Sequence, residues 1–467
     1  MEKEVCDRMK KRTGETMGMD FTDGAILPML LRYFLPFLLA NLLNSIYNTV
    51  DTIIVGQFVG SAGIVAVTVG GKMLNLFTNI GFSFAAGGQI LISQIVGEKR
   101  REEINSTIGT LFTEMMISSV AAAGLLILLS NNIVVWMNTP EESVGAALAY
   151  LRITSFGLPL IFGYNAVCAV LRGMGDSKSP LIYIAVAAGF NVVGDYLFVA
   201  FLDMGAAGTA IATIMAQGCA LAFSICTLYK KREKFGFDFK RKSFRVDRVK
   251  LKIMVKIGFP MALRNICIGL TQVVLLGSVN LYGLAEATAY SIGDKFVHLA
   301  NIFHAATTQA AAGMIGQNIG ADRKDRVRVI VRHSGAIALG AAIILSLLSI
   351  LFPYAIFGLF TDDASTLVYA PVYMRIGCIT LLLSAVMGAL EAVVTGTGNS
   401  GLSFLSGLLD GVVFRISFSF LLAYVFEMGA AGFFMGDALA RLGPILVGGI
   451  YYFGGAWKRR GKLLNKK

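Results

Sequence analysis

Long apolar runs separated by short polar breaks dominate the sequence. Each run holds about 20 or more mostly apolar residues, the length that an α-helix needs to cross a hydrocarbon layer. The pattern therefore predicts an all-α integral membrane protein with about twelve transmembrane helices. The predicted spans are 28–56, 61–96, 104–130, 143–173, 179–201, 206–229, 253–281, 284–318, 327–352, 366–395, 400–425 and 430–454. Several exceed a straight crossing, so we expect tilt, kinks or ends that project beyond the membrane.

Basic residues gather at alternate ends of the predicted helices. They fall at 3–12, 99–101, 172–178, 230–252, 323–332 and 458–467, whereas the loops at 57–60, 131–142, 203, 282, 362–363 and 427 contain none. By the positive-inside rule, both termini and the long central loop are expected to be cytoplasmic, in a multi-pass protein of the cell (plasma) membrane. The net charge of +12 thus reflects topology, and no nucleic-acid partner is expected.

Composition agrees with the membrane assignment. Of the 467 residues, 55% are hydrophobic and only 15% are charged, against about 25% charged in soluble domains. The six cysteines are scattered without a CxxC pair, so neither a disulfide framework nor a metal site is implied. Residues 1–27 are expected to form a cytoplasmic segment without a cleavable signal peptide, because the first 20 residues lack an apolar core.

The two halves of the chain are related by an internal repeat with an offset of about 223 residues. Residues 60–72 match 283–295, 150–152 match 373–375, 173–177 match 396–400 and, after one residue of drift, 204–208 match 428–432 and Pro36 matches Pro260. The repeat predicts two pseudo-symmetric six-helix lobes, 28–230 and 253–455. A basic linker, 231–252, joins them, and a basic cytoplasmic tail, 456–467, follows.

Six helices return the chain to its starting side, so both lobes have the same orientation. Parallel repeats of this kind are typical of secondary transporters, which move their halves for alternating access. Membrane enzymes instead show paired acids, a His/Asp cluster or a nucleophile beside a base, and the sequence has no such spacing. We therefore expect a transporter and not an enzyme.

A carboxylate inside one predicted span is a candidate for ion coupling. Asn191 and Asp195 are four residues apart and share one helix face. A charged side chain at membrane depth costs roughly 2.5–3.5 kcal/mol even on the lenient insertion scale, so Asp195 is expected to face a cavity or a partner. Two readings stay open at this point: a polar contact between helices, or a cation or proton site.

Several segments resemble the MATE (multidrug and toxic compound extrusion) family, over nearly the whole chain from about Leu31 to Phe453. The segments that carry the resemblance are Pro36, Asn41, 47–51 with Gly56, 60–72, 171–176, 191–195 and 205–208. The resemblance implies a V-shaped pair of lobes that exports organic, often cationic or amphiphilic compounds by antiport with protons or sodium. Related families in the same larger fold group flip lipid-linked precursors, which gives the alternative function.

The resemblance also implies a coupling site. In DinF-type members an acid of helix 1 and the Asn/Asp pair of helix 5 form the cation site, which corresponds here to Asp51, Asn191 and Asp195. The NorM-type branch uses acids of helices 7 and 10, but predicted helix 7 contains neither Asp nor Glu. The site is not duplicated, because the matching positions of the second half are Phe414 and Phe418 or, with one residue of drift, Arg415 and Ser419.

Other polar residues within the spans are weaker candidates. Thr209, Thr213 and Gln217 share one helix face and, with Asn48, are expected either to line the cavity or to bond between helices. Glu391 is a second proton-site candidate, although a contact within the lobe is favoured. Lys72 and Lys295 are repeat-related, which favours a structural role over one as counter-ions to acids. The remaining acids expected to be structural are Glu114, Asp410 and Asp437, and the embedded basic residues that keep the lipid-flippase alternative open are Lys72, Arg264, Lys295 and Arg415.

The expected partners follow from this interpretation. They are small organic substrates and membrane lipid, with H⁺ or Na⁺ as coupling ion and no other cofactor. The histidines His298, His304 and His333 lack metal-ligand spacing, so the one metal expected is sodium at Asp51, Asn191 and Asp195. Because each chain carries both halves of a complete path, we expect the monomer to be functional.

Overall fold

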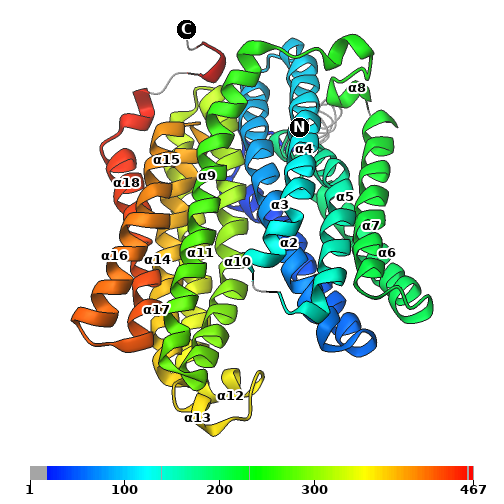
Figure 1. Cartoon of the computed structure of the whole chain (residues 1–467). Helices are drawn as coiled ribbons and strands as arrows, with labels where there is room; N and C mark the ends of the chain where they lie inside the picture. Colours follow the sequence, from blue (N-terminus) through cyan, green and yellow to red (C-terminus); the bar gives the residue numbers. More distant parts are fainter. Residues whose placement is uncertain (1–17, 138, 231, 460–461, 466–467) are drawn as a thin grey trace. The chain divides into compact units, whose positions relative to one another are not determined.

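The computed structural model describes residues 18–137, 139–230, 232–459 and 462–465, and these are mostly helical, with short turns between the helices and no strand among them (Figure 1). Parts of the predicted terminal segments, 1–17, 460–461 and 466–467, lie outside these ranges. Eleven helical stretches of the described residues are long and apolar enough to cross a membrane. The predicted all-α membrane fold is therefore confirmed.

The chain forms two compact units, and two of the three boundaries between them fall within helices. Unit 1 comprises the described residues up to Gly24 together with Leu35–Gly258, and unit 2 comprises Ala25–Phe34 together with the described residues from Phe259 onward. The boundary after Gly24 lies just before α2, and the other two lie close to Pro36 and Pro260, which are inside α2 and α9. Each helix is continuous across its boundary, so each unit holds part of a helix that continues in the other.

The helices of unit 1 follow the predicted spans closely. They are α2 (Ile26–Phe58), α3 (Gly60–Gly97), α4 (Glu102–Trp136), α5 (Glu141–Gly173), α6 (Lys178–Asp195), a π-helical stretch Tyr196–Phe201, α7 (Gly205–Lys230), α8 (Arg232–Phe235), a 3₁₀ turn Arg241–Phe244 and the start of α9 (Arg248–Val279). The last residues of the predicted linker 231–252 are therefore already helical.

Unit 2 is less regular than the sequence suggests. It contains the rest of α9 and then α10 (Leu284–Gly320), α11 (Lys324–Leu351), α12 (Pro353–Gly358), α13 (Ala364–Leu367), α14 (Ala370–Gly396), α15 (Ser400–Leu408), π-helical Leu409–Phe414, α16 (Arg415–Phe420), π-helical Leu421–Val425, α17 (Gly429–Leu439) and α18 (Leu442–Phe453). The predicted span 284–318 is α10, which is long but not among the eleven apolar stretches. It carries Glu286, Asp294 and Lys295, which lower its apolar character.

One central helix organises each unit. In unit 1, α5 packs against α3, α4 and α7, and apolar side chains such as Leu151 and Leu158 are fully buried there. In unit 2, α14 packs against α10, α11 and α18, with Tyr373 and Met374 buried in the core. Because α5 and α14 occupy matching places in the repeat, the two units are built on the same plan.

The turns between helices repeat the same backbone conformation in both halves. Positive φ angles occur at five repeat-related pairs: Gly60 and Gly283, Lys99 and Asp322, Gly175 and Gly398, Asp203 and Glu427, and Gly205 and Gly429. At Gly175 (φ 88°) and Gly398 (φ 64°) glycine adopts this left-handed region without a Cβ penalty. The offset is 223 residues for the first three pairs and 224 for the last two.

The change of offset has a structural cause in unit 2. Between the third and fourth pairs, unit 1 has regular α-helix from Lys178 to Asp195, whereas unit 2 has the π-helical stretch Leu409–Phe414. A π-helix bonds residue i to i+5 and so takes up one additional residue. The later π-helical stretches, Tyr196–Phe201 and Leu421–Val425, match each other with the offset of 224 residues. Asn191 and Asp195 therefore correspond to Arg415 and Ser419, the second of the two predicted registers.

Candidate functional site

Unit 1 brings Asp51 of α2 together with Asn191 and Asp195 of α6. Their side chains are buried, with exposed fractions of 7%, 1% and 0%. With its NH₂ group turned toward Asp51, the Asn191 amide donates to Oδ1 at 2.7 Å and to Oδ2 at 3.3 Å. The carboxyl groups of Asp51 and Asp195 also lie within interaction distance of each other. The sequence predicted these three residues as a set, and the structure places them as one cluster.

No basic side chain of the described residues neutralises the cluster. Both carboxyl oxygens of Asp195 are without a hydrogen-bond partner among the described residues, and no basic side chain of this part of the chain pairs with Asp51 or Asp195. Two adjacent carboxylates away from water repel each other and lose hydration. A proton or a small cation between them would remove both costs, so the arrangement is suited to bind one.

Close helix packing holds the cluster in place. A Cβ atom on Gly194 would meet the Ala212 Cβ of α7 at 3.0 Å, and one on Gly208 would meet the Phe198 backbone at 3.0 Å. Tyr150 of α5 lies near both carboxylates and packs on Gly70 of α3. Small residues at these points let α6 and α7 approach closely.

The predicted cavity-lining residues of α7 differ from one another. Thr209 is 1% exposed, and its hydroxyl has no partner among the described residues. Thr213 and Gln217 are half-buried, and the Thr213 hydroxyl donates to the carbonyl of Thr209 at 2.9 Å. The side chain of Asn48 lies outside the described part of the chain. The Thr209 hydroxyl is thus a buried oxygen without a partner among the described residues, one turn from Ala212, which packs against α6.

Unit 2 contains a different arrangement, a chain of alternating charges that the sequence did not reveal. The charge chain runs through Glu391, Arg264, Asp410, Arg415, Asp437 and Arg441, contributed by α9, α14, the π-helical stretch 409–414, α16, α17 and the residue that precedes α18. Three guanidinium groups balance three carboxylates, so the cluster as a whole is neutral.

Each link of this charge chain is a direct contact. Arg264 pairs with Glu391 and lies 3.3 Å from Asp410 Oδ2. Arg415 Nη2 lies 2.9 Å from Asp410 Oδ1, its Nε donates to the Asp410 carbonyl at 3.2 Å, and it pairs with Asp437. Arg441 Nη1 lies 3.2 Å from Asp437 Oδ2. Glu391, predicted as a second proton-site candidate, is therefore neutralised by Arg264.

The predicted lysines take no part in the ion pairs of these clusters, whereas the buried His304 lies near Arg264, Asp410 and Arg441 of the charge chain. Lys72 is exposed, and the exposed Lys295 has its Nζ 5.8 Å from the centre of the Phe360 ring. In the described part of the chain no group of three or more His, Cys, Asp or Glu side chains is placed to hold a metal ion. Glu114 is buried at 6% exposure and accepts a hydrogen bond from Ser118 at 3.2 Å.

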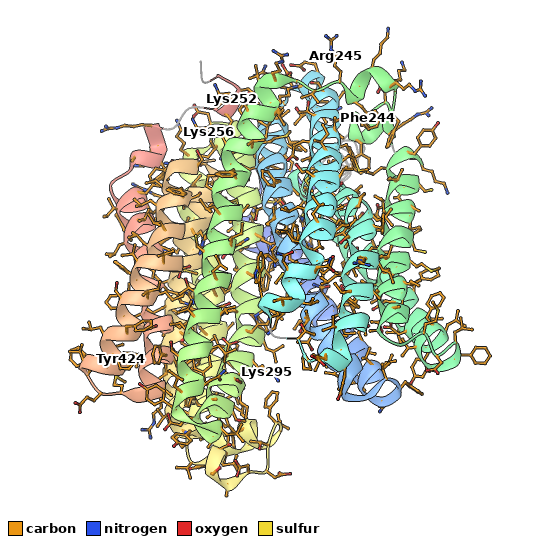
Figure 2. The ribbon with its side chains drawn as sticks, in the orientation of Figure 1. Phe244, Arg245, Lys252, Lys256, Lys295 and Tyr424 are labelled. Atoms are coloured by element: carbon orange, nitrogen blue, oxygen red, sulfur yellow. The ribbon has the colours of Figure 1, made fainter. Side chains whose placement is uncertain are left out.

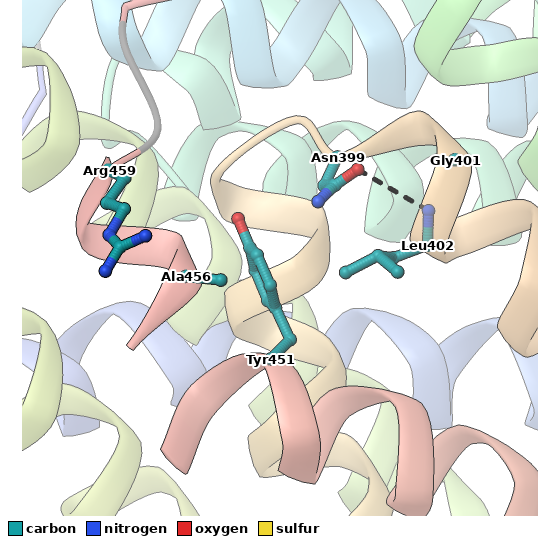
Figure 3. A pocket seen from close by; sticks show the side chains of 6 residues that line it. All are labelled: Asn399, Gly401, Leu402, Tyr451, Ala456 and Arg459. Atoms are coloured by element: carbon teal, nitrogen blue, oxygen red, sulfur yellow. Dashed lines mark hydrogen bonds between the residues drawn. The ribbon is translucent and has the colours of Figure 1, made fainter. Parts of the chain in front are cut away.

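An open pocket of about 460 Å³ lies elsewhere in unit 2, where α14 turns into α15 (Figure 3). Asn399, Tyr451 and Arg459 contribute its polar side chains. Asn399 caps α15 by accepting from the Leu402 N–H at 3.5 Å, and the Tyr451 hydroxyl is 3.1 Å from Thr397 Oγ1. Since Asn399 and Tyr451 serve the turn itself and none of the lining residues is acidic, the pocket is not part of the carboxylate cluster.

Fold and site together define a helical, multi-span membrane protein made of two repeated units with an unneutralised carboxylate pair in one of them. The MatE family model matches residues 36–197 and 260–428, which cover one segment of each half. The chain therefore belongs to the MatE family, and the predicted resemblance is confirmed.

Known proteins of similar length support the assignment. The probable multidrug resistance protein YoeA of Bacillus subtilis is 24% identical over 92% of this chain and 93% of its own length. The probable multidrug resistance protein NorM of Thermotoga maritima is 21% identical over 94% of each. The solved structure of an outward-facing multidrug resistance MATE family transporter of the MOP superfamily matches with a TM-score of 0.88 at 19% identity, over 95% of this chain and 99% of that one.

Proposed function

We propose that this protein exports small organic compounds across the cell membrane by antiport with H⁺ or Na⁺. Units 1 and 2 would act as the two lobes of an alternating-access transporter, with both termini in the cytoplasm. Its relatives are named multidrug resistance proteins, which supports organic compounds as the substrates. Asp51, Asn191 and Asp195 are the proposed coupling site.

The contrast between the units carries this proposal. In unit 2 each of the three carboxylates of the charge chain has an arginine partner, so none is available to a mobile cation. In unit 1 the Asp51–Asp195 pair has an amide neighbour and no basic partner among the described residues. A cation that enters the protein would therefore have its most favourable electrostatic interaction at the Asp51–Asp195 pair of unit 1.

The proposed cycle uses only these groups. When a proton or a sodium ion neutralises the carboxylates, the Asn191 amide remains beside them, because an amide can both donate to a carboxylate and accept from a carboxyl group. Sodium would take carboxylate and amide oxygens, with the Thr209 hydroxyl as a further candidate ligand. A cationic substrate would compete for the same negative charge, so release of one favours binding of the other. This competition couples the two movements.

Flipping of lipid-linked precursors has less support. That alternative rested on embedded basic residues that would attract a pyrophosphate head group. Arg264 and Arg415, two of those residues, are each paired with acids inside unit 2, so their charge is already balanced. The relatives described above are also named for multidrug resistance.

Transport in proteoliposomes tests the proposal. Wild type and Asp195→Asn would be reconstituted with a fluorescent organic cation, and a pH gradient and a sodium gradient would be imposed separately. We expect wild type to move the dye under one of the two gradients. The transport rate of Asp195→Asn under that gradient should be at least tenfold lower. The matched control is Glu114→Gln, which removes another buried membrane carboxylate and should keep most of the activity. Normal exchange by Asp195→Asn under both gradients would overturn the site.

A further inference from the structure

The linker of unit 1 is bound tightly to α4 through one buried lysine. Lys250, in the first turn of α9, is 2% exposed. Its Nζ lies 2.6 Å from Glu103 Oε2, donates to the Glu103 carbonyl at 3.1 Å and contacts the Ser106 hydroxyl. Just before α9, the Asp247 N–H donates to Thr110 Oγ1 at 3.0 Å. The start of α9 is thus fixed in rotation against α4.

This rotation turns a row of basic residues outward. Arg248, Lys252 and Lys256 are spaced four residues apart, so they share one face of α9. That face is about 200° from Lys250, since each residue of an α-helix advances the direction by about 100°. All three side chains are exposed, as is Arg245 just before the helix, and Figure 2 shows Arg245, Lys252 and Lys256 along this end of α9. We call Arg248, Lys252 and Lys256 the basic stripe.

The acids nearby in the sequence do not neutralise the basic stripe. Asp247 accepts from the Val249 and Lys250 N–H groups at 2.9 and 3.3 Å, and Glu103 is engaged by Lys250 and by Arg100, whose Nη2 lies 3.0 Å from Glu103 Oε1. Within the described part of the chain, no ion pair involves a residue of the stripe. Like charges four residues apart repel, and cations near a helix N-terminus oppose the helix dipole. An anion from outside would therefore stabilise the arrangement.

Length and surroundings indicate which anion fits. Arg248 and Lys256 are about 12 Å apart along the helix axis, enough to span a lipid headgroup layer of about 5–8 Å. Val249 and Val255, which alternate with the stripe, are 59% and 37% exposed, and the helix then continues into an apolar span. A ligand with a phosphate next to an apolar body would match both features.

We propose that the basic stripe is a binding site for the phosphate groups of anionic phospholipids. The positive-inside rule alone explains why basic residues lie at this end of α9. That rule does not require the basic residues to share one face of the helix or to lack acid partners. It also does not require a buried lysine on the opposite face, which here orients the basic stripe outward. The proposal is independent of the antiport mechanism, because it concerns the lipid around unit 1 and not the carboxylate pair.

Lipid binding to the full-length protein tests the proposal. Purified protein in detergent would be titrated with phosphatidylglycerol, with phosphatidylcholine and with glycerol 3-phosphate, and bound molecules would be counted by native mass spectrometry. Wild type should retain phosphatidylglycerol in preference to the other two. Each basic residue near a membrane surface contributes about fivefold to the affinity for an anionic lipid. The variant Arg248→Gln/Lys252→Gln/Lys256→Gln, which lacks three of them, should therefore bind phosphatidylglycerol about 100-fold more weakly. Displacement of the lipid by equimolar glycerol 3-phosphate would overturn the phospholipid assignment.

Two further variants separate a site from general charge. Lys458→Gln/Arg459→Gln/Lys462→Gln removes the same three charges from the C-terminal segment and should keep the preference; an equal loss in both triple variants would mean diffuse attraction and overturn the site. Arg248→Lys/Lys252→Arg/Lys256→Arg keeps every charge and should bind like wild type. A loss in this last variant would also contradict recognition by charge. Thermal melting of each variant confirms that the fold is retained.

Discussion

The Asn191 amide nitrogen lies 2.7 Å from Oδ1 of Asp51 and so joins α6 to α2 inside unit 1. Both residues are buried, and the amide is an uncharged donor that the structure places against this carboxylate. An uncharged donor leaves the negative charge of the site in place, which a lysine or arginine would cancel. The amide therefore orients Asp51 without removing its capacity to bind a cation.

Replacement of this amide should harm both stability and transport. Asn191→Ala leaves Asp51 without its donor, and an unsatisfied buried acceptor costs about 1–3 kcal/mol. We expect a lower melting temperature together with a drop of at least tenfold in gradient-driven dye exchange. Asn131→Ala is the control, because it removes an exposed amide that accepts from Arg152 at 3.3 Å. Unchanged exchange in Asn191→Ala would show that the amide does not orient the site.

The charge chain of unit 2 should respond strongly to loss of a central member. Arg415 contacts both Asp410 and Asp437 and is 3% exposed. Removal of one partner of a buried ion pair costs about 3–5 kcal/mol, because a charge is left uncompensated. Arg415→Met should therefore lower the melting temperature far more than Glu391→Gln does, since Glu391 is 20% exposed and Arg264 keeps its contact with Asp410.

A compensated variant checks this explanation. Arg415→Met/Asp437→Leu removes one positive and one negative charge together and should recover part of the stability lost in Arg415→Met alone. Melting of the three variants, monitored by tryptophan fluorescence or by aggregation, gives the comparison. If the double variant is no more stable than the single one, packing around Arg415 and not its charge controls stability here.

The sequence was sufficient for the helices and for the carboxylate cluster, but not for the charge chain. Hydropathy fixes where a helix crosses the membrane, and the four-residue spacing of Asn191 and Asp195 sets their common face. The members of the charge chain lie on several helices, and neither the hydropathy pattern nor the repeat marks them. Only tertiary packing shows that Arg264 reaches Glu391 across 127 positions of the chain.

The repeat register shows the same limit on a smaller scale. Comparison of the two halves left either Phe414 or Arg415 as the match of Asn191. It shows that the second half has one additional residue, but not at which position that residue is inserted. The π-helical stretch Leu409–Phe414 absorbs the additional residue and so brings Arg415 to that place. With this register, Thr213 and Gln217 of unit 1 correspond to Asp437 and Arg441 of unit 2. Polar positions of one lobe have thus become charged positions of the charge chain in the other.

The linker contains a carboxylate whose titration should be measurable. Asp238 Oδ1 accepts from the Ser243 hydroxyl at 2.5 Å and from the Lys240 N–H at 3.0 Å, and these bonds, the Ser243 bond foremost, lower the pKa of Asp238 below its ordinary value. A lowered pKa in the folded state means that the contribution to stability is fully present above the unfolded value of about 3.9. It is lost as the pH falls through the lower, folded value.

Carboxyl-carbon NMR of protein labelled at aspartate would follow this titration. We expect Asp238 to titrate below an unperturbed aspartate, and Ser243→Ala to move its pKa upward because the largest cause of the shift is removed. An Asp238 midpoint that is the same in wild type and in Ser243→Ala would contradict the proposed role of the hydroxyl.

The contact between Lys250 and Glu103 should decide whether the linker stays attached to α4. Lys250→Met keeps the length of the buried side chain but removes its bonds to Glu103 and Ser106, and hydrogen bonds to charged groups contribute about 1.5–3 kcal/mol. Glu103 retains Arg100, so the damage should be local. We expect faster amide hydrogen exchange in 237–250, with α5 and α6 unchanged. Lys252→Met, on the exposed face of the same helix, should leave the exchange of this segment as in wild type, and equal acceleration in both variants would mean that helix charge, not the buried contact, holds the linker.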